Sequence, residues 1–311
     1  MWKLPKPIAV LTIALPCFAQ TPLVKGAGNF IHAVGNLDQS IHFYKDLIGM
    51  ESPRPPGDWQ TTEGIAKMYA AGGAKYRVGN AQVTGVAMRV ELVEFQNPDR
   101  RPVRRALGEP GASLLILTAA DLQPVLDRLK AANWPLVTET SKSCSGPGLA
   151  TADPDGFPVL VLQQTRSAAP ANNKNITGLR FGYTVSSGAV LNGPFKALGL
   201  AGSARPSDCP TAEEALLKDN APTIVKLPDG FEITLVHAQP GKKSAGTLRQ
   251  MDPGAAVLRF PVTDAEAAVR ALGEARVKVV SEGGAIQTLP PTGLKAVILD
   301  APDNLFIQVV Q

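Results

Sequence analysis

The stretch Asp121–Glu139, DLQPVLDRLKAANWPLVTE, has a counterpart in the same chain at Asp264–Glu282, DAEAAVRALGEARVKVVSE, and the two align without a gap. Both copies place apolar residues at helical spacing and then continue into a strand rich in Val. Leu129 of the first copy corresponds to Leu272 of the second. Because a repeat of this length is much harder to obtain by chance than a short motif, it decides how the fold is organised.

Each copy is followed by a turn and then by an apolar, β-branched run. The turns are Asp153–Gly156 (DPDG) and Pro302–Asn304 (PDN), and the runs are Phe157–Leu162 and Leu305–Val310. Asp, Asn and Gly accept the backbone angles that tight turns require. We therefore predict a β-hairpin at both places.

The parts of the chain that precede these copies also correspond. Leu47–Met50 (LIGM) is similar to Ala197–Leu200 (ALGL), and Val90–Phe95 (VELVEF) is similar to Ile233–Ala238 (ITLVHA). The chain thus repeats one plan of roughly 140 residues. We predict two domains, 26–164 and 176–311, joined by a polar linker at 165–175.

Hydrophobic periodicity predicts the elements of the first copy. The expected helices lie at 38–47 and 122–132. The expected strands lie at 29–34, 75–78, 86–95, 114–118, 135–139, 148–152 and 158–163. Each unit thus consists of a strand, a helix and two or three further strands, and we interpret the chain as four units of the βαβββ type, two in each copy.

The N-terminus is typical of a signal peptide. Lys3 and Lys6 precede an apolar run, Ile8–Ala19, that is too short to span a bilayer. We expect residues 1–20 to be removed and the mature protein to be periplasmic or secreted, without a membrane span. The first twenty residues hold two lysines and no acid, so removing them lowers the formal net charge from +4 to +2, too little to indicate nucleic acid. Cys144 and Cys209 then remain, and their pairing as a disulfide stays open.

The stretch Ile31–Met50 (IHAVGNLDQSIHFYKDLIGM) resembles the opening of a domain of the vicinal-oxygen-chelate superfamily, which contains glyoxalases, bleomycin-resistance proteins and dioxygenases. Val90–Glu94 resembles the fourth-strand signature of that superfamily, and Asp153–Gly156 its final hairpin. The resemblance implies an α+β fold in which four βαβββ modules form two half-open mixed-sheet barrels around a small ligand. The modules of such proteins pair as one with two and three with four, or as one with four and two with three. The sequence does not choose between these pairings.

The resemblance also implies a divalent metal, held by His, Gln or Glu of the first and last strands of each unit. Counting from the motif places the eight ligand positions at Asn29, Glu91, Leu114, Leu160, Arg180, Thr234, Val257 and Gln308. They include one carboxylate, one glutamine and no histidine. Since a transition-metal site needs at least three converging donors, we expect no metal and no other cofactor.

Single residues allow a functional and a structural interpretation. Glu91 is a candidate general base or hydrogen-bond acceptor, but Arg89 on the same strand face could hold it in an ion pair. Arg180 could bind an anion or extend into solvent. His32 lies on the strand face opposite to Asn29, which is typical of a packed histidine. None of the three histidines has the spacing of a metal site.

Three functions remain open at the level of the sequence. The first is an exported protein, monomeric or homodimeric, that binds a small organic molecule in a cup without a metal. The residues expected to line this cup are Asn29, Arg89, Glu91, Arg180, Thr234 and Gln308. The second is a lyase or isomerase that acts next to a carbonyl group with Glu91 as the base. The third is a structural module whose cup is filled by its own side chains.

Overall fold

The computed structural model describes residues 22–96, 99–140, 143, 145–164, 175–205, 211–219, 221–244 and 246–311. The expected signal peptide, Cys144, Cys209 and nearly all of the linker lie outside these ranges, so what the sequence says of them stays a prediction. In the described part of the chain, no helix is both long and apolar enough to cross a membrane.

The first half of the chain holds the first two units. The first unit contains β1 (Phe30–Val34), α1 (Leu37–Ile41), the π-helical turn η1 (His42–Ile48), α2 (Glu63–Met68), β2 (Lys75–Gln82) and β3 (Arg89–Gln96). The second unit contains β4 (Ser113–Ala119), α3 (Gln123–Ala131), β5 (Leu136–Thr140), β6 (Gly148–Ala152) and β7 (Pro158–Gln163). In the first unit, isolated antiparallel β-bridges pair Glu51 with Gln82 and Gln60 with Tyr76. They occupy the place that a further strand takes in the βαβββ order.

The second half repeats this order with different element lengths. The third unit contains β8 (Ile176–Val185), the π-helical turn η2 (Leu191–Phe195), β9 (Gly202–Ala204), α4 (Ala212–Leu217), β10 (Thr223–Lys226) and β11 (Glu232–His237). The fourth unit contains β12 (Ala256–Pro261), α5 (Ala265–Glu274), β13 (Lys278–Val279), η3 (Glu282–Gly284), β14 (Gln287–Leu289), β15 (Leu294–Ala301), η4 (Pro302–Asn304) and β16 (Leu305–Val310).

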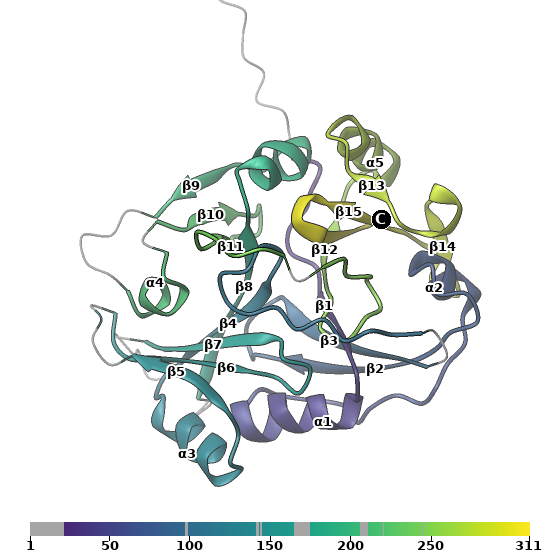
Figure 1. The fold of residues 1–311 in the computed structure, drawn as a ribbon. Helices are drawn as coiled ribbons and strands as arrows, with labels where there is room; N and C mark the ends of the chain where they lie inside the picture. Colours follow the sequence, from purple (N-terminus) through teal and green to yellow (C-terminus); the bar gives the residue numbers. More distant parts are fainter. Residues whose placement is uncertain are drawn as a thin grey trace, which may run out of the picture.

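The strands form two eight-stranded mixed sheets, which confirms the predicted α+β class (Figure 1). One sheet has the order β13-β15-β16-β12-β1-β3-β2, with β14 paired to β15. The other has the order β5-β6-β7-β4-β8-β11-β10-β9. Units one and four thus share a sheet, called the 1+4 sheet below, and units two and three share the 2+3 sheet. Each sheet combines one unit from 26–164 with one from 176–311.

Antiparallel pairs between first strands join the two halves. In the 1+4 sheet β1 pairs with β12, and Phe30 lies opposite Leu258. In the 2+3 sheet β4 pairs with β8, and Leu115 lies opposite Phe181. The rings of Phe30 and Phe181 are 4.9 Å apart, and both belong to the large apolar core that the two sheets share. The sheets therefore pack against each other through one face each.

The opposite face of each sheet has its own smaller apolar cluster. Along β1 the side chains alternate, so Ile31 and Ala33 belong to the cluster on this second face. Helix α2 contacts β14 and β15 of the 1+4 sheet, and α4 contacts β5, β6 and β7 of the 2+3 sheet (Figure 1). We call the space between the 1+4 sheet and α2 the first cup, and the space between the 2+3 sheet and α4 the second cup.

Candidate functional site

Four polar side chains meet in the first cup because the strand registers bring their positions level. They belong to Asn29, Glu91, Arg259 and Gln308. Ile31 lies beside Glu91 in the parallel pair β1–β3, and Arg259 lies beside Gln308 in the parallel pair β12–β16. Asn29 lies opposite Arg259, whose backbone N–H donates to the carbonyl oxygen of Asn29 at 3.2 Å. Four neighbouring strands, or the residues next to them, thus present one side chain each.

These side chains form a continuous hydrogen-bonded row. Nη1 and Nη2 of Arg259 donate to Oε2 and Oε1 of Glu91 at 3.2 and 3.4 Å. Arg259 Nε donates to Oε1 of Gln308. Nδ2 of Asn29 donates to Oε2 of Glu91 at 2.8 Å, and Nε of Arg89 donates to Oδ1 of Asn29 at 3.1 Å. Glu91 is therefore paired with Arg259, and Arg89, its expected partner, contacts Asn29 instead.

Arg259 is the member of this row that the sequence did not predict. Counting from the family motif placed the fourth-unit position at Val257, two residues earlier on the strand. Because strand side chains alternate, Val257 and Arg259 share a face, and this alternation was the available signal. The structure places Arg259, not Val257, level with Gln308.

A small cavity opens beside this row. Its volume is about 60 Å³, well below the range of roughly 300–1,000 Å³ that is usual for drug-sized ligands. Its walls are mainly apolar and aromatic, with Glu91, Arg259 and Gln308 as charged or amide groups. The lining residues are Ile65, Met68, Tyr69, Tyr76, Val78, Glu91, Val93, Arg259, Leu289, Leu294 and Gln308.

The second cup holds the other two residues that were expected to line the site. Nη2 of Arg180 contacts Oε2 of Glu213 at 2.6 Å, and its Nη1 donates to the hydroxyl of Thr234 at 3.0 Å. Glu213 belongs to α4, which also inserts Leu216 and Leu217 into this cup. The expected lining residues therefore divide: Arg180 and Thr234 lie in the second cup, and Asn29, Arg89, Glu91 and Gln308 lie in or beside the first.

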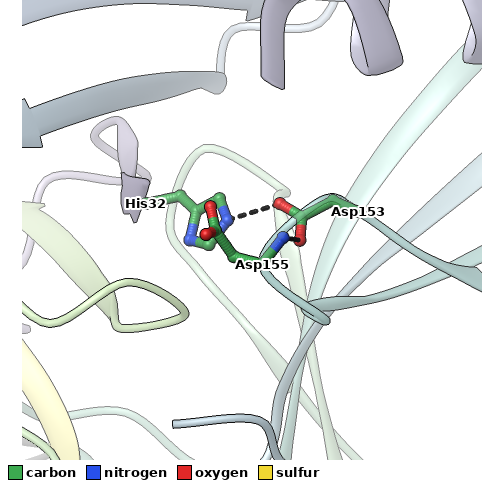
Figure 2. Close-up of side chains that lie close together, drawn as sticks. All are labelled: His32, Asp153 and Asp155. Carbon is green, nitrogen blue, oxygen red and sulfur yellow. Dashed lines mark hydrogen bonds and ion pairs between the residues drawn. The ribbon is translucent and has the colours of Figure 1, made fainter. Parts of the chain in front are cut away.

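A third polar group lies between the two sheets, on the face of β1 opposite to the first cup (Figure 2). His32 Nε2 is 2.7 Å from Oδ2 of Asp153, and its Nδ1 is 3.0 Å from the carbonyl oxygen of Ala255. The hydroxyl of Tyr44 donates to the same Asp153 oxygen at 3.2 Å. Asp155, two residues after Asp153 in the β6–β7 turn, lies beside them and accepts the backbone N–H of Gly35 at 2.9 Å. His32 was expected to be packed, and it is fully buried.

Burial and mutual charge shift the pKa values of this group. Burial disfavours the charged imidazole of His32, but the carboxylate of Asp153 outweighs it, and the pKa of His32 is raised. Burial and the neighbouring charge of Asp153 raise the pKa of Asp155. Burial also raises the pKa of Tyr44, and Asp153 adds to that shift. Asp153 is thus the charge on which the whole group depends.

The expectation that the chain lacks a donor set for a divalent metal is wrong. His32, Asp153 and Asp155 each offer one ligand atom, and these atoms all lie within 4.8 Å of one another, so the group could hold a metal ion. The eight positions counted from the family motif exclude all three residues. Sequence reasoning missed the group because 121 residues separate His32 from Asp153, and the DPDG segment was interpreted only as a turn. The segment is that turn as well: Asp153 Oδ1 accepts the backbone N–H of Asp155 and of Phe157.

Comparison with known proteins places the fold. Residues 28–161 match the model of the Glyoxalase/Bleomycin resistance protein/Dioxygenase superfamily. Glyoxalase I from Zea mays has 17% sequence identity and a TM-score of 0.62, and the match covers 92% of each chain. A candidate dioxygenase from Bacillus subtilis has 14% identity and a TM-score of 0.56, covering 93% of this chain and 86% of the other. No curated protein matches the chain in sequence.

These findings agree with the arrangement of the sheets. The chain contains a domain of the Glyoxalase/Bleomycin resistance protein/Dioxygenase superfamily and has the glyoxalase fold over most of its length. At such low identity the solved structures establish the fold alone.

Proposed function

We propose that this protein binds a small organic anion in the first cup. The observation that carries the proposal is the cavity beside Arg259, Glu91 and Gln308, which joins apolar walls to a few convergent polar groups. That combination is typical of small-molecule sites. A volume of about 60 Å³ corresponds to a few water-sized spheres of roughly 10–15 Å³ each, so the ligand has only a few non-hydrogen atoms.

The charges of the row favour an anion. The row contains two guanidinium groups, those of Arg89 and Arg259, and one carboxylate, that of Glu91, which leaves one net positive charge. The side chains of Arg259 and Glu91 are 20% and 19% exposed, so a ligand reaches the pair while solvent screens it only in part. A guanidinium binds a carboxylate through two parallel N–H groups, which selects planar anions over neutral molecules of the same size. The parallel N–H groups of Arg259 already donate to Glu91 and Gln308, so a ligand carboxylate has to displace one of these acceptors.

The second cup has the opposite character and supports a structural role there. Arg180 is bound by Glu213, which is 3% exposed, and α4 places Leu216 and Leu217 against Leu114 and Leu160 of the sheet. This cup is filled by the chain itself, as the third hypothesis from the sequence describes. Arg180 therefore provides a matched control for Arg259.

Calorimetric titration of the purified protein tests the proposal. Small monocarboxylates of two to four carbons are compared with the neutral amides of the same acids at low salt. We expect saturable binding of at least one acid, weaker binding of its amide, and a loss of about tenfold or more in affinity in Arg259→Lys, which keeps the charge but loses the planar fork. Arg180→Lys should bind as the wild type does.

Two outcomes would contradict the proposal. One is equal affinity for acid and amide, and the other is an equal effect of Arg259→Lys and Arg180→Lys. If every acid leaves the heat signal unchanged while the protein is folded, the first cup does not bind small carboxylates.

We also propose that residues 1–20 direct export to the periplasm or the medium. The apolar run Ile8–Ala19 behind two lysines supports this. N-terminal sequencing of the protein recovered from the periplasm or medium of a bacterial host should give a start near residue 21. Recovery of the uncleaved chain from the cytoplasm would contradict export. Monomer or homodimer stays a prediction that gel filtration with light scattering can test.

A further inference from the structure

We infer that His32, Asp153 and Asp155 bind one divalent transition-metal ion at the junction between the two sheets. This site is separate from the first cup, because His32 projects from the face of β1 opposite to Ile31 and the cup. The inference therefore does not depend on the proposed anion binding. It rests on the geometry, the orientation and the burial of the three donors.

Each donor is oriented by a hydrogen bond on its far side. Nδ1 of His32 donates to the carbonyl oxygen of Ala255, so Nε2 is the nitrogen turned to Asp153 and the one that offers a lone pair to an ion once its proton is lost. Oδ1 of Asp153 accepts two backbone N–H groups at 2.9 Å each, so Oδ2 is the atom turned to His32. One oxygen of Asp155 accepts the N–H of Gly35. Such supporting hydrogen bonds are regular partners of metal-binding side chains.

The three donor atoms lie close enough together for local side-chain movement to bring them around one ion. An ion at about 2.0–2.2 Å from each donor separates adjacent donors by about 3.0–3.5 Å. In the structure His32 Nε2 and Asp153 Oδ2 are 2.7 Å apart, and the three ligand atoms lie within 4.8 Å of one another. The ion takes the place of the proton between His32 and Asp153, which leaves to solvent. One imidazole nitrogen and two carboxylate oxygens suit Zn²⁺, Mn²⁺ or Fe²⁺.

The carboxylates of Asp153 and Asp155 are wholly or partly shielded from water, so a nearby positive charge stabilises them. His32 is 0% and Asp153 4% exposed, and Asp155 is half-buried. Two carboxylates carry more negative charge than one imidazolium can balance, whereas a divalent ion balances both beside a neutral imidazole. Arg100, which donates to the carbonyl oxygen of Val34 at 2.9 Å, adds positive charge at the edge of the group.

A surface cavity of about 320 Å³ borders the turn between β6 and β7 at Asp153 and Pro154. The side chains of His32 and Asp153 are themselves 0% exposed, so an ion enters only when this turn moves. His32 comes from unit one, the two aspartates from unit two, and Ala255 from the start of unit four. A bound ion would therefore tie together units that belong to different sheets.

Metal analysis of the full chain tests this inference. Protein made without a polyhistidine tag is stripped with a chelator, loaded with Zn²⁺ or Mn²⁺, desalted and measured by elemental analysis. We expect one ion per chain in the wild type and at least a tenfold loss of affinity in Asp155→Asn, whose amide oxygen can still accept the N–H of Gly35. Asp46→Asn is the matched control, because Asp46 pairs with an exposed histidine, His42, at 2.9 Å. It should retain the ion.

A second measurement keeps the test decisive if Asp155→Asn does not fold. Co²⁺ added to the wild type should shift the NMR signals of the His32 imidazole and leave those of His42 and His237 in place. Equal retention of metal by Asp155→Asn and wild type, no retention by the folded wild type, or a Co²⁺ effect confined to His42 or His237 overturns the inference.

Discussion

Glu91 is held by donors from two other strands or their ends, Asn29 Nδ2 at 2.8 Å and Arg259 Nη1 at 3.2 Å. Glu91→Gln keeps an acceptor oxygen but removes the negative charge beside Arg259. If the first cup binds an anion, the affinity for a small carboxylate should rise by up to about tenfold, because repulsion by Glu91 is lost. Calorimetry at low salt measures this change.

The control for that change is Glu232→Gln, since Glu232 pairs with Arg205 in the second cup at 3.3 Å. It should leave the affinity unaltered. A Glu91→Gln protein that binds a carboxylate as the wild type does, yet loses turnover of a carbonyl compound, would instead identify Glu91 as a base.

The buried carboxylate of Asp252 makes the free energy of unfolding depend on pH in the acid range. Burial opposes its charge, but Arg249 and the backbone N–H groups of Arg101 and Arg249 outweigh burial, and the pKa of Asp252 is lowered. A carboxyl group whose pKa is lower in the folded state contributes stability above its unfolded pKa of about 3.9, and this is lost as the pH falls through the folded value.

Asp252→Asn should therefore lower the free energy of unfolding at pH 7 by about 1–3 kcal/mol. The difference from the wild type should shrink below pH of about 4. Urea titrations at several pH values measure it, and Asp127→Asn, at an exposed position on α3, serves as the control. A difference that stays constant down to the acid range would show that the charge of Asp252 is not responsible.

At the scale of the residue, the sequence predicts positions but not partners. Asn29, Glu91 and Gln308 were located by counting along single strands from residues that resemble the family motif, which uses local sequence alone. Arg259 lies two residues after Val257, the position that the count from the family motif gave. His32 contacts Asp153 only because the two sheets pack against each other. Contacts between elements so far apart in the chain leave no local pattern in one sequence.

Among the elements, the first helix ends against the second unit. Gly49 closes η1 with a positive φ of 96°, and the last carbonyl groups of the helix accept from Arg128 of α3. Nε of Arg128 donates to Leu47 and Nη2 donates to Ile48, each at 2.8 Å. These carbonyls have no partner within the helix, so Arg128 acts as a cap supplied by another unit.

Arg128→Met keeps much of the aliphatic side chain and removes both hydrogen bonds. We expect the free energy of unfolding to fall by about 1–3 kcal/mol, because two carbonyl groups lose a charged donor. Chemical denaturation followed by circular dichroism measures the loss. Lys130→Met, at an exposed position on the same helix, should change stability by less than about 0.5 kcal/mol, and a similar loss in both variants would contradict the cap.

The length and the pattern of a helix or strand decide whether the sequence predicts it. Helix α3 and the strands β6 and β7 lie close to their predicted ranges because each has a clear period or turn signal. Helices α2 and α4 were not predicted, since six residues are too few to show a helical period. The capping box of Thr211 and Glu214 was the available signal for α4.

For the whole molecule, the pairing of the units lies beyond the sequence. Either pairing buries the same apolar strand faces, so hydrophobic pattern does not distinguish them. The structure pairs β1 with β12 and β4 with β8, and both pairs connect the two halves of the chain. The two copies of the repeat are thus interlocked through both sheets, and neither sheet is built from one copy.

Cutting the chain between the copies tests this interlocking. A protease site introduced between Gln164 and Asn175, on the two sides of the predicted linker, separates the halves covalently without touching a described strand. The cut protein should elute from gel filtration at the size of the uncut one, because each sheet still holds strands of both fragments and a shared apolar core covers them. The uncut protein with the same insertion is the control. Two fragments that separate without denaturant and each keep a cooperative unfolding transition would mean that the units pair within each half, as one with two and three with four.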